Sequence, residues 1–365
     1  MTAPRVPDSR FRAYVQFVVA LLYYFLARAL AHRGATGLSS DQWSPLVEQA
    51  MLVFLLLLGY AGVGFSLNGQ AHPIKAQGLP RRPGWIREAG LGLAIGWGIV
   101  VVCAAAIAIG GGIAVRFSFS LQSWGWFLVD AAFFALAALA QEIAFRGYAF
   151  QRFARAVGSG GAVLGFAVLF AFLQNLDPGA NRASALVAFV VTIVLSLAYL
   201  RTRALWVSWG INFGWMGARA LIFGLAIRGV NSHSPVVQGD PMGPFWLTGG
   251  GFGLDGSWLA FFVFLAAIPV VYRFTRELDY RYNTPEIVAA GIPVDLDAAA
   301  RRQHEAATRE AAAEPAPPPL VQIAPAASPD LGPRAGWVSN PDSGRNPDQS
   351  LPHSQPHPIS GNESE

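Results

Sequence analysis

The chain has 365 residues, of which 53% are apolar and 13% are charged, and its mean hydropathy is +0.39. These values differ from soluble averages in the direction of polytopic membrane proteins, so they argue against a soluble enzyme. The net charge of +4 comes from arginines in short loops rather than from a continuous basic stripe, which argues against nucleic acid as a partner. The sole cysteine, Cys103, lies in an apolar run, which excludes an internal disulfide and a thiolate metal site.

Eight apolar runs are long enough, or nearly so, to cross a bilayer, which takes about 20 helical residues. In chain order they cover residues 11–32, 47–67, 89–115, 124–146, 161–175, 183–200, 205–225 and 258–272. Because these runs are continuous rather than alternating, they predict helices and not barrel strands. The sequence therefore predicts an all-α, polytopic membrane bundle of about eight transmembrane helices, with the lipid bilayer as its surroundings.

The arginines of the loops predict the orientation of the bundle. The N-terminal segment, the even-numbered loops and the C-terminal flank hold most of the basic residues, whereas the opposite loops hold only Arg33, Arg116, Arg182 and Arg228. Positively charged loops stay on the cytoplasmic side, so both termini are expected in the cytoplasm. The bias towards arginine, alanine and glycine is typical of a high-GC bacterial genome, which places the protein in a bacterial plasma membrane.

The composition also predicts three regions along the chain. Residues 1–120 hold the N-terminal transmembrane helices, and residues 121–275 hold the membrane core with the motifs described below. Beyond Tyr282 the sequence turns to Ala, Pro, Ser, Asn and charged residues, which cannot bury enough apolar surface to fold alone. Residues 276–365 are therefore predicted to form a cytoplasmic tail, disordered from about residue 285.

Ionisable side chains inside the apolar runs are candidates for function, because each costs about 2.5 to 3.5 kcal/mol to insert. Glu142 and Arg146 lie one helical turn apart, so Glu142 is either a proton acceptor or one half of a structural ion pair. The Glu-before-Arg order at this spacing favours the ion pair. Asp130 and Arg219 are the other two such charges, and they could pair across the bundle or line a polar pathway.

Small residues in the third run predict close helix packing. Gly92, Gly96 and Gly98 follow one another at short intervals within residues 89–115. Small residues let helix backbones approach closely in a membrane. We expect all three glycines to serve packing rather than ligand binding.

Polar residues at membrane depth recur in three motifs. The first is Gln141-Glu142-x-x-x-Arg146, the second is Phe170-x-x-x-Gln174, and the third places Asn212 and Met216 in a run rich in Trp and Gly. Counted from the turn between their helices, Gln141 and Gln174 differ in depth by about 6 Å, at 1.5 Å per residue, so they could face each other. A glycine-rich loop, residues 247–257, follows and contains Asp255.

At these residues the chain resembles the CPBP family of intramembrane CAAX-type endopeptidases. The family pattern is Glu-Glu-x-x-x-Arg, then Phe-x-x-x-His, then His-x-x-x-Asn, and residues 247–257 are similar to a glycine-rich loop of some bacterial members. The resemblance covers residues 124–257. It implies that one Glu and one His activate water, while the later His and Asn stabilise the oxyanion of the attacked peptide bond.

The departures from this pattern bear on mechanism. The four family positions hold Gln141, Gln174, Asn212 and Met216, none of which titrates, while Glu142 and Arg146 are retained. An amide cannot take a proton from water near neutral pH, although Gln174 or Asn212 could still donate to an oxyanion. The six histidines lie outside the motif helices, so neither a metal nor another cofactor is expected.

The sequence therefore favours a catalytically degenerate CPBP-family membrane protein, a pseudoenzyme. The resemblance implies that its cavity binds a hydrophobic, prenylated or transmembrane peptide. Two alternatives stay open. One is an active intramembrane endopeptidase that uses Glu142, and the other is a transporter-like protein whose pathway contains Asp130 and Arg219.

Overall fold

The computed structural model describes residues 10–68, 72–228, 234, 236–278, 287–289, 292–294 and 304–305. The chain divides into two compact units, Met1–Pro293 and Val294–Glu365, and the helices named below all belong to the first. The structure is 79% helical, which confirms the predicted all-α class. Most of the predicted tail lies outside the described residues.

Each of the eight predicted runs forms a helix. In chain order these are α1 (Arg10–Leu38), α2 (Ser44–Asn68), α4 (Trp85–Gly110), α5 (Leu121–Arg146), α7 (Ser159–Gln174), α8 (Arg182–Thr202), α9 (Leu205–Gly217) and α11 (Trp258–Phe274). Five helices of the described residues are long and apolar enough to cross a membrane, namely α1, α2, α4, α5 together with its continuation, and α8. The protein is thus a helical membrane protein by composition and length, while the count of eight spans stays a prediction.

Shorter helical segments connect or extend these eight. A short helix α3 (Pro73–Ala76) precedes α4, and α6 (Tyr148–Val157) continues α5 after a bend at Gly147. A β-carbon at Gly147 would lie 2.4 Å from the carbonyl oxygen of Ile143, so the bend requires glycine. The π-helical segment η1 (Ala218–Ile222) extends α9. Because α9 and η1 are continuous, they fill most of the predicted run over residues 205–225.

The third run was predicted to stay helical as far as residue 115, and this was wrong at its end. The helix α4 stops at Gly110, and Gly112 then adopts a φ of 96°, in the left-handed region that favours glycine. Strand β1 (Ile113–Phe117) follows and pairs antiparallel with β2 (Val237–Pro241), with Ile113 opposite Pro241. The strand pair joins the connection after α4 to the connection after η1.

The glycine-rich loop folds against the helices. The short helix α10 (Phe245–Thr248) leads into it, and the loop itself contains η2 (Gly250–Phe252) and η3 (Leu254–Gly256); α10 packs against α4 and α11. Leu247 and Leu254 are buried in the same apolar core as α8, α9 and α11. Beyond residue 285, where disorder was predicted, the structure describes a strand pair, β3 (Ile287–Ala289) and β4 (Ile292–Val294).

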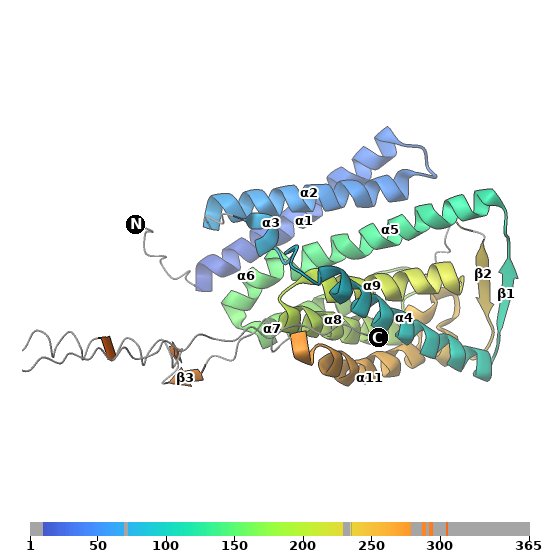
Figure 1. Ribbon diagram of the computed structural model, residues 1–365. Helices are drawn as coiled ribbons and strands as arrows, with labels where there is room; N and C mark the ends of the chain where they lie inside the picture. The colour runs from blue at the N-terminus through green and yellow to red at the C-terminus, as the bar shows by residue number, and fades with distance from the viewer. Residues whose placement is uncertain are drawn as a thin grey trace, which may run out of the picture. The chain divides into compact units, whose positions relative to one another are not determined.

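The bundle has two main apolar clusters. One joins α1, α2, α6 and α7 to the C-terminal part of α5, around Tyr60, Phe145 and Phe166. The other joins α4, α8, α9 and α11 around Val194, Ile211 and Phe264, and Figure 1 shows α9 running between α5 and this group of helices. Helix α9 is therefore surrounded by α4, α5 and α8, with which it makes contact.

Glycines set the distance between α4 and α9. A β-carbon at Gly92 would lie 2.2 Å from the carbonyl oxygen of Val207, and one at Gly96 would lie 2.3 Å from that of Ile211. From the other side, a β-carbon at Gly210 would lie 2.3 Å from the carbonyl oxygen of Ala89. The packing role predicted for Gly92 and Gly96 is confirmed. For Gly98 it was wrong, because nothing lies within 4 Å of its β-carbon position.

Candidate functional site

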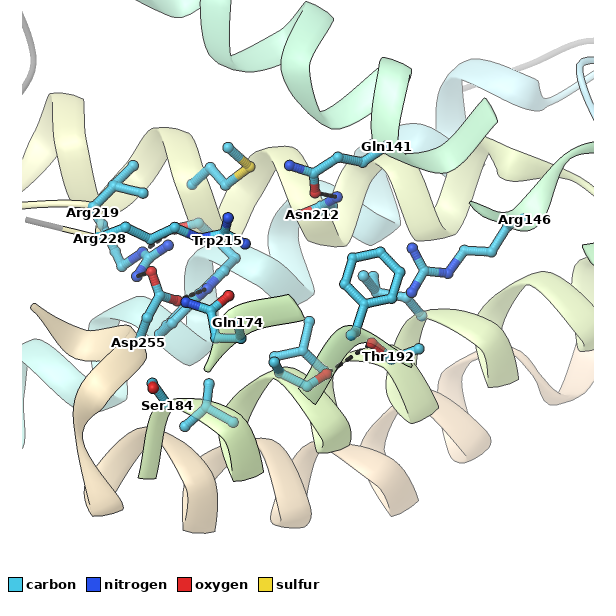
Figure 2. Close-up of a pocket in the computed structure, with 17 residues that line it drawn as sticks. Gln141, Arg146, Gln174, Ser184, Thr192, Asn212, Trp215, Arg219, Arg228 and Asp255 are labelled. Carbon is cyan, nitrogen blue, oxygen red and sulfur yellow. Dashed lines mark hydrogen bonds and ion pairs between the residues drawn. The ribbon is translucent and has the colours of Figure 1, made fainter. Parts of the chain in front are cut away.

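A cavity of about 140 Å³ lies among α5, α7, α8 and α9, as Figure 2 shows. The side chains at all four substituted motif positions line it, namely Gln141, Gln174, Asn212 and Met216. Arg146 and Phe170, the retained residues of the first two motifs, line it as well. Three motifs that are far apart in the sequence thus converge on one internal space.

Asn212 connects two of the motifs. Its Nδ2 donates to Oε1 of Gln141 at 3.1 Å and to Oε1 of Glu142 at 3.2 Å. The register between α9 and α5 is further held by Trp209, whose indole nitrogen donates to the carbonyl oxygen of Ala135 at 2.9 Å. Asn212 therefore acts as a donor to α5, and its amide is occupied by protein acceptors.

Glu142 and Arg146 form a buried ion pair. Nη1 of Arg146 lies 3.0 Å from Oε1 of Glu142, and the two side chains are 2% and 0% exposed. Arg146 lines the cavity, with its guanidinium 5.9 Å from the ring centre of Phe170, whereas Glu142 is not among the lining residues. Of the two predicted roles for Glu142, the geometry is that of a structural ion pair.

Gln174 lies apart from Gln141. In Figure 2, Gln141 lies beside Asn212, whereas Gln174 lies on the other side of the cavity, beside Asp255. The Gln174 side chain is 5% exposed, and no described residue provides a hydrogen-bond partner for its Nε2. The two glutamines line one cavity from α5 and α7, and among the described residues no hydrogen bond joins them.

A second ion pair lies at this side of the cavity, and it corrects one expectation. Pairing of Arg219 with Asp130 was one of the two roles considered for these charges, but Nη1 of Arg219 lies 2.9 Å from Oδ2 of Asp255. The guanidinium stacks 3.9 Å from the ring centre of Trp215, whose indole nitrogen donates to Oδ1 of Asp255 at 3.2 Å. Asp130 instead accepts a hydrogen bond from the backbone nitrogen of Ser234 at 2.8 Å.

Two charged residues of the cavity were missed by the sequence reasoning. Asp255 lines the cavity from the glycine-rich loop, and Arg228 lines it from the segment after η1, where it pairs with Asp177 at 3.4 Å. The acidic position in the loop that resembles the family was a signal for Asp255. No comparable signal marked Arg228, because its place depends on how two connections meet in space.

The cavity offers hydrogen-bond donors rather than a metal site. Among the described residues, no group of three or more His, Cys, Asp or Glu side chains lies close enough together to hold a metal ion. Among the described residues that line the cavity, Asp255 alone carries a carboxylate, and Arg219 binds that carboxylate. The cavity can therefore hold polar backbone groups through amide donors, between apolar walls that include Phe170, Val191 and Leu195.

Comparison with protein families gives one match. Residues 122–218 match the family described as type II CAAX prenyl endopeptidase Rce1-like. The match confirms, over this segment, the family predicted from the motifs, and it includes Gln141, Gln174, Asn212 and Met216. Comparisons with curated proteins and with solved structures gave no match. The matched segment and the apolar helices together fit a CAAX-protease-like membrane protein.

Proposed function

We propose that this protein holds a hydrophobic, prenylated or transmembrane peptide in its internal cavity and does not hydrolyse it. One observation carries the proposal. The side chains at the four family positions line a single cavity, and none of them is a base, since they are two glutamines, an asparagine and a methionine. A cavity that gathers the side chains of the family's motif positions but lacks the family's proton acceptor is suited to binding a peptide without hydrolysing it.

The two carboxylates near the cavity do not replace the missing base. Glu142 is held by Arg146 and Asn212, and Asp255 is held by Arg219 and Trp215. Oε1 of Glu142 and the two carboxylate oxygens of Asp255 are bound by those partners, and water would have to displace the partners to reach these atoms. Positioned acid–base catalysis is worth about 10² to 10⁴ in rate, so its loss leaves little hydrolysis.

An active endopeptidase that uses Glu142 is the second candidate, and one observation favours it. Oε2 of Glu142 and Nε2 of Gln174 have no hydrogen-bond partner among the described residues. The first atom could accept a proton from water, and the second could donate to an oxyanion. The burial of Glu142 behind Asn212 and Arg146 argues against this role, because the carboxylate does not line the cavity.

A transporter-like function is less well supported. It required Asp130 and Arg219 to form a polar pathway, but Arg219 pairs with Asp255 and Asp130 does not line the cavity.

The proposal also retains the predicted setting of the site: eight spans in a bacterial plasma membrane, both termini in the cytoplasm, a core over residues 121–275 and a tail from residue 276. The bias of the loop arginines supports the orientation.

Restoring the family residues tests the proposal. The full chain, purified in detergent, and its triple variant Gln141→Glu, Gln174→His, Asn212→His are each given a farnesylated peptide and the same peptide without the lipid. We expect the natural chain to bind the farnesylated peptide without cutting it, and the triple variant to gain slow cleavage. Cleavage by the natural chain that disappears in Glu142→Gln would instead establish the endopeptidase.

A further inference from the structure

Strands β1 and β2 form a two-stranded ribbon across the end of the bundle where α4 ends and α5 begins, as Figure 1 shows. The chain enters the ribbon from α4 through Gly112 and leaves it at Ser120, which caps α5. No residue of β1 or β2 is among those that line the cavity of the motif residues. The ribbon therefore has to be explained separately from the proposed peptide site.

The register of the two strands gives the ribbon one apolar and one polar face. In an antiparallel pair, residues that lie opposite each other point to the same face, and the faces alternate along each strand. The apolar face carries Ile113, Val115 and Phe117 of β1 with Pro241, Gly239 and Val237 of β2. The polar face carries Ala114, Arg116, Gln238 and Asp240, and Nη2 of Arg116 donates to Oδ2 of Asp240 at 2.7 Å. The ribbon is therefore amphipathic.

The apolar face points towards the helices. A β-carbon at Gly239 would lie 2.1 Å from the carbonyl oxygen of Phe223, the residue directly after η1. Ile113 packs against the apolar cluster of α4, α8, α9 and α11. Because α4 and α5 are long and apolar enough to cross a membrane, the face that meets the helix ends points towards the membrane layer, and the polar face points away from it.

Part of the apolar face extends beyond the helices that it covers. The side chains of Val115 and Phe117 are exposed, the latter by 61%. Phe119 follows two residues later and is 71% exposed, and its ring stacks on that of Phe117 with the ring centres 5.8 Å apart. An exposed apolar patch of this kind marks a surface that contacts a partner protein or a membrane.

The patch continues onto the surface of α5. Leu121, Trp124 and Leu128 are exposed at positions i, i+3 and i+7 of this helix, so they form one stripe. The stripe lies at the beginning of a helix that is long and apolar enough to cross a membrane, and its exposed apolar side chains therefore meet lipid. Tryptophan is enriched where such helices leave the hydrocarbon layer. The stripe thus connects the exposed part of the ribbon with lipid rather than with a protein surface.

The backbone of the ribbon limits its depth. The ribbon has two strands, so among the described residues β1 has a neighbouring strand on one side only. The N–H and C=O groups of an open edge need water, and open edges do not occur within the hydrocarbon of a bilayer. At the level of the headgroups, water reaches these groups while an apolar face still contacts the acyl chains, as in other amphipathic segments that lie in the interface.

We propose that the ribbon lies in the headgroup layer of the leaflet at this end of the bundle and that the side chains of Val115, Phe117 and Phe119 insert towards the acyl chains. Arg116 and Asp240 face water on the opposite side. The partner of this surface is the lipid bilayer itself. By holding the end of α4 and the start of α5 at one depth, the ribbon anchors the helix that carries Gln141. The proposal does not depend on whether the motif cavity binds a peptide.

Nitroxide labels at single cysteines test the proposal. The variants Val115→Cys, Arg116→Cys, Phe117→Cys and Phe119→Cys of the full chain are labelled and placed in liposomes of phosphatidylethanolamine and phosphatidylglycerol. Cys103 is the sole natural cysteine and is buried, so the natural chain treated with the same reagent gives the background. Electron paramagnetic resonance then measures how often each label collides with oxygen, which dissolves in lipid, and with a nickel chelate, which stays in water.

We expect the ratio of oxygen to nickel collisions to be high at positions 115, 117 and 119 and low at position 116. Arg116→Cys is the matched control, because it is adjacent to Phe117 and equally accessible, and the exposed ion pair that it removes contributes little to stability. If Phe117→Cys does not fold, Phe119→Cys compared with Arg116→Cys decides the same question.

Three outcomes would overturn the proposal. Frequent nickel collisions at all four positions would place the ribbon in water. Few collisions with either agent at positions 117 and 119 would mean that protein covers the patch. Magnetic broadening between labels that disappears on dilution with unlabelled chain would identify a second copy of the chain as the partner.

Discussion

The contact between α4 and α9 gives a sharp prediction, because two glycines two residues apart should respond in opposite directions to the same substitution. In Gly96→Ala the new β-carbon would lie 2.3 Å from the carbonyl oxygen of Ile211, and the backbones must separate by about 1 Å to reach an ordinary contact. Overpacking of this kind costs about 1 to 3 kcal/mol. In Gly98→Ala the new methyl group meets nothing within 4 Å, and alanine is favoured over glycine in a helix by up to about 1 kcal/mol.

The measurement is the free energy of unfolding of each variant in detergent, followed by circular dichroism over a denaturant titration. Gly96→Ala should be destabilised, and Gly98→Ala should be neutral or slightly stabilised. The first variant should also weaken peptide binding, because α9 carries Asn212 and Met216 into the cavity. If the free energy of unfolding changed equally in the two variants, in either direction, contact with the α9 backbone would not be what distinguishes the two glycines, and the reasoning would be refuted.

Two further predictions concern the buried ion pairs. Asp255→Asn should destabilise the fold by about 3 to 5 kcal/mol, because Arg219 is 1% exposed and would keep an uncompensated charge. Adding Arg219→Met should recover much of the lost stability. The measurement is the thermal unfolding midpoint, and an unchanged midpoint in Asp255→Asn would contradict the pairing. Glu142→Gln should likewise destabilise the fold, because Arg146 would keep a buried charge without its partner, and bound peptide should stay uncut as in the natural chain. A variant as stable as the natural chain would show that the pair has no structural role.

The apolar runs predicted the helices well, and the physical reason is local. In a bilayer each backbone N–H and C=O group must find its hydrogen-bond partner within the segment, so a long apolar run forms a helix. The end of the third run departs from this rule at Gly110, where glycines interrupt the helix and Ile113 begins a strand. A strand there depends on a partner, Val237–Pro241, that lies far away in the sequence.

The candidate site was predicted in part. The motifs predicted a common site for their polar residues, and Gln141, Gln174, Asn212 and Met216 line one cavity from α5, α7 and α9. Spacing along a helix also predicted the pair of Glu142 with Arg146, which needs no tertiary contact. What depth and spacing leave open is the rotation of each helix about its axis.

Pairing between helices was therefore decided by tertiary structure. Arg219 faces the glycine-rich loop and pairs with Asp255, while Asp130 faces the backbone of Ser234, so two charges that could pair by sequence have separate partners. The same rotation puts Gly96 against α9 and leaves Gly98 in open space. Periodic apolar segments and local spacing determine which elements form, whereas the face that each helix presents results from the packing of all its neighbours together.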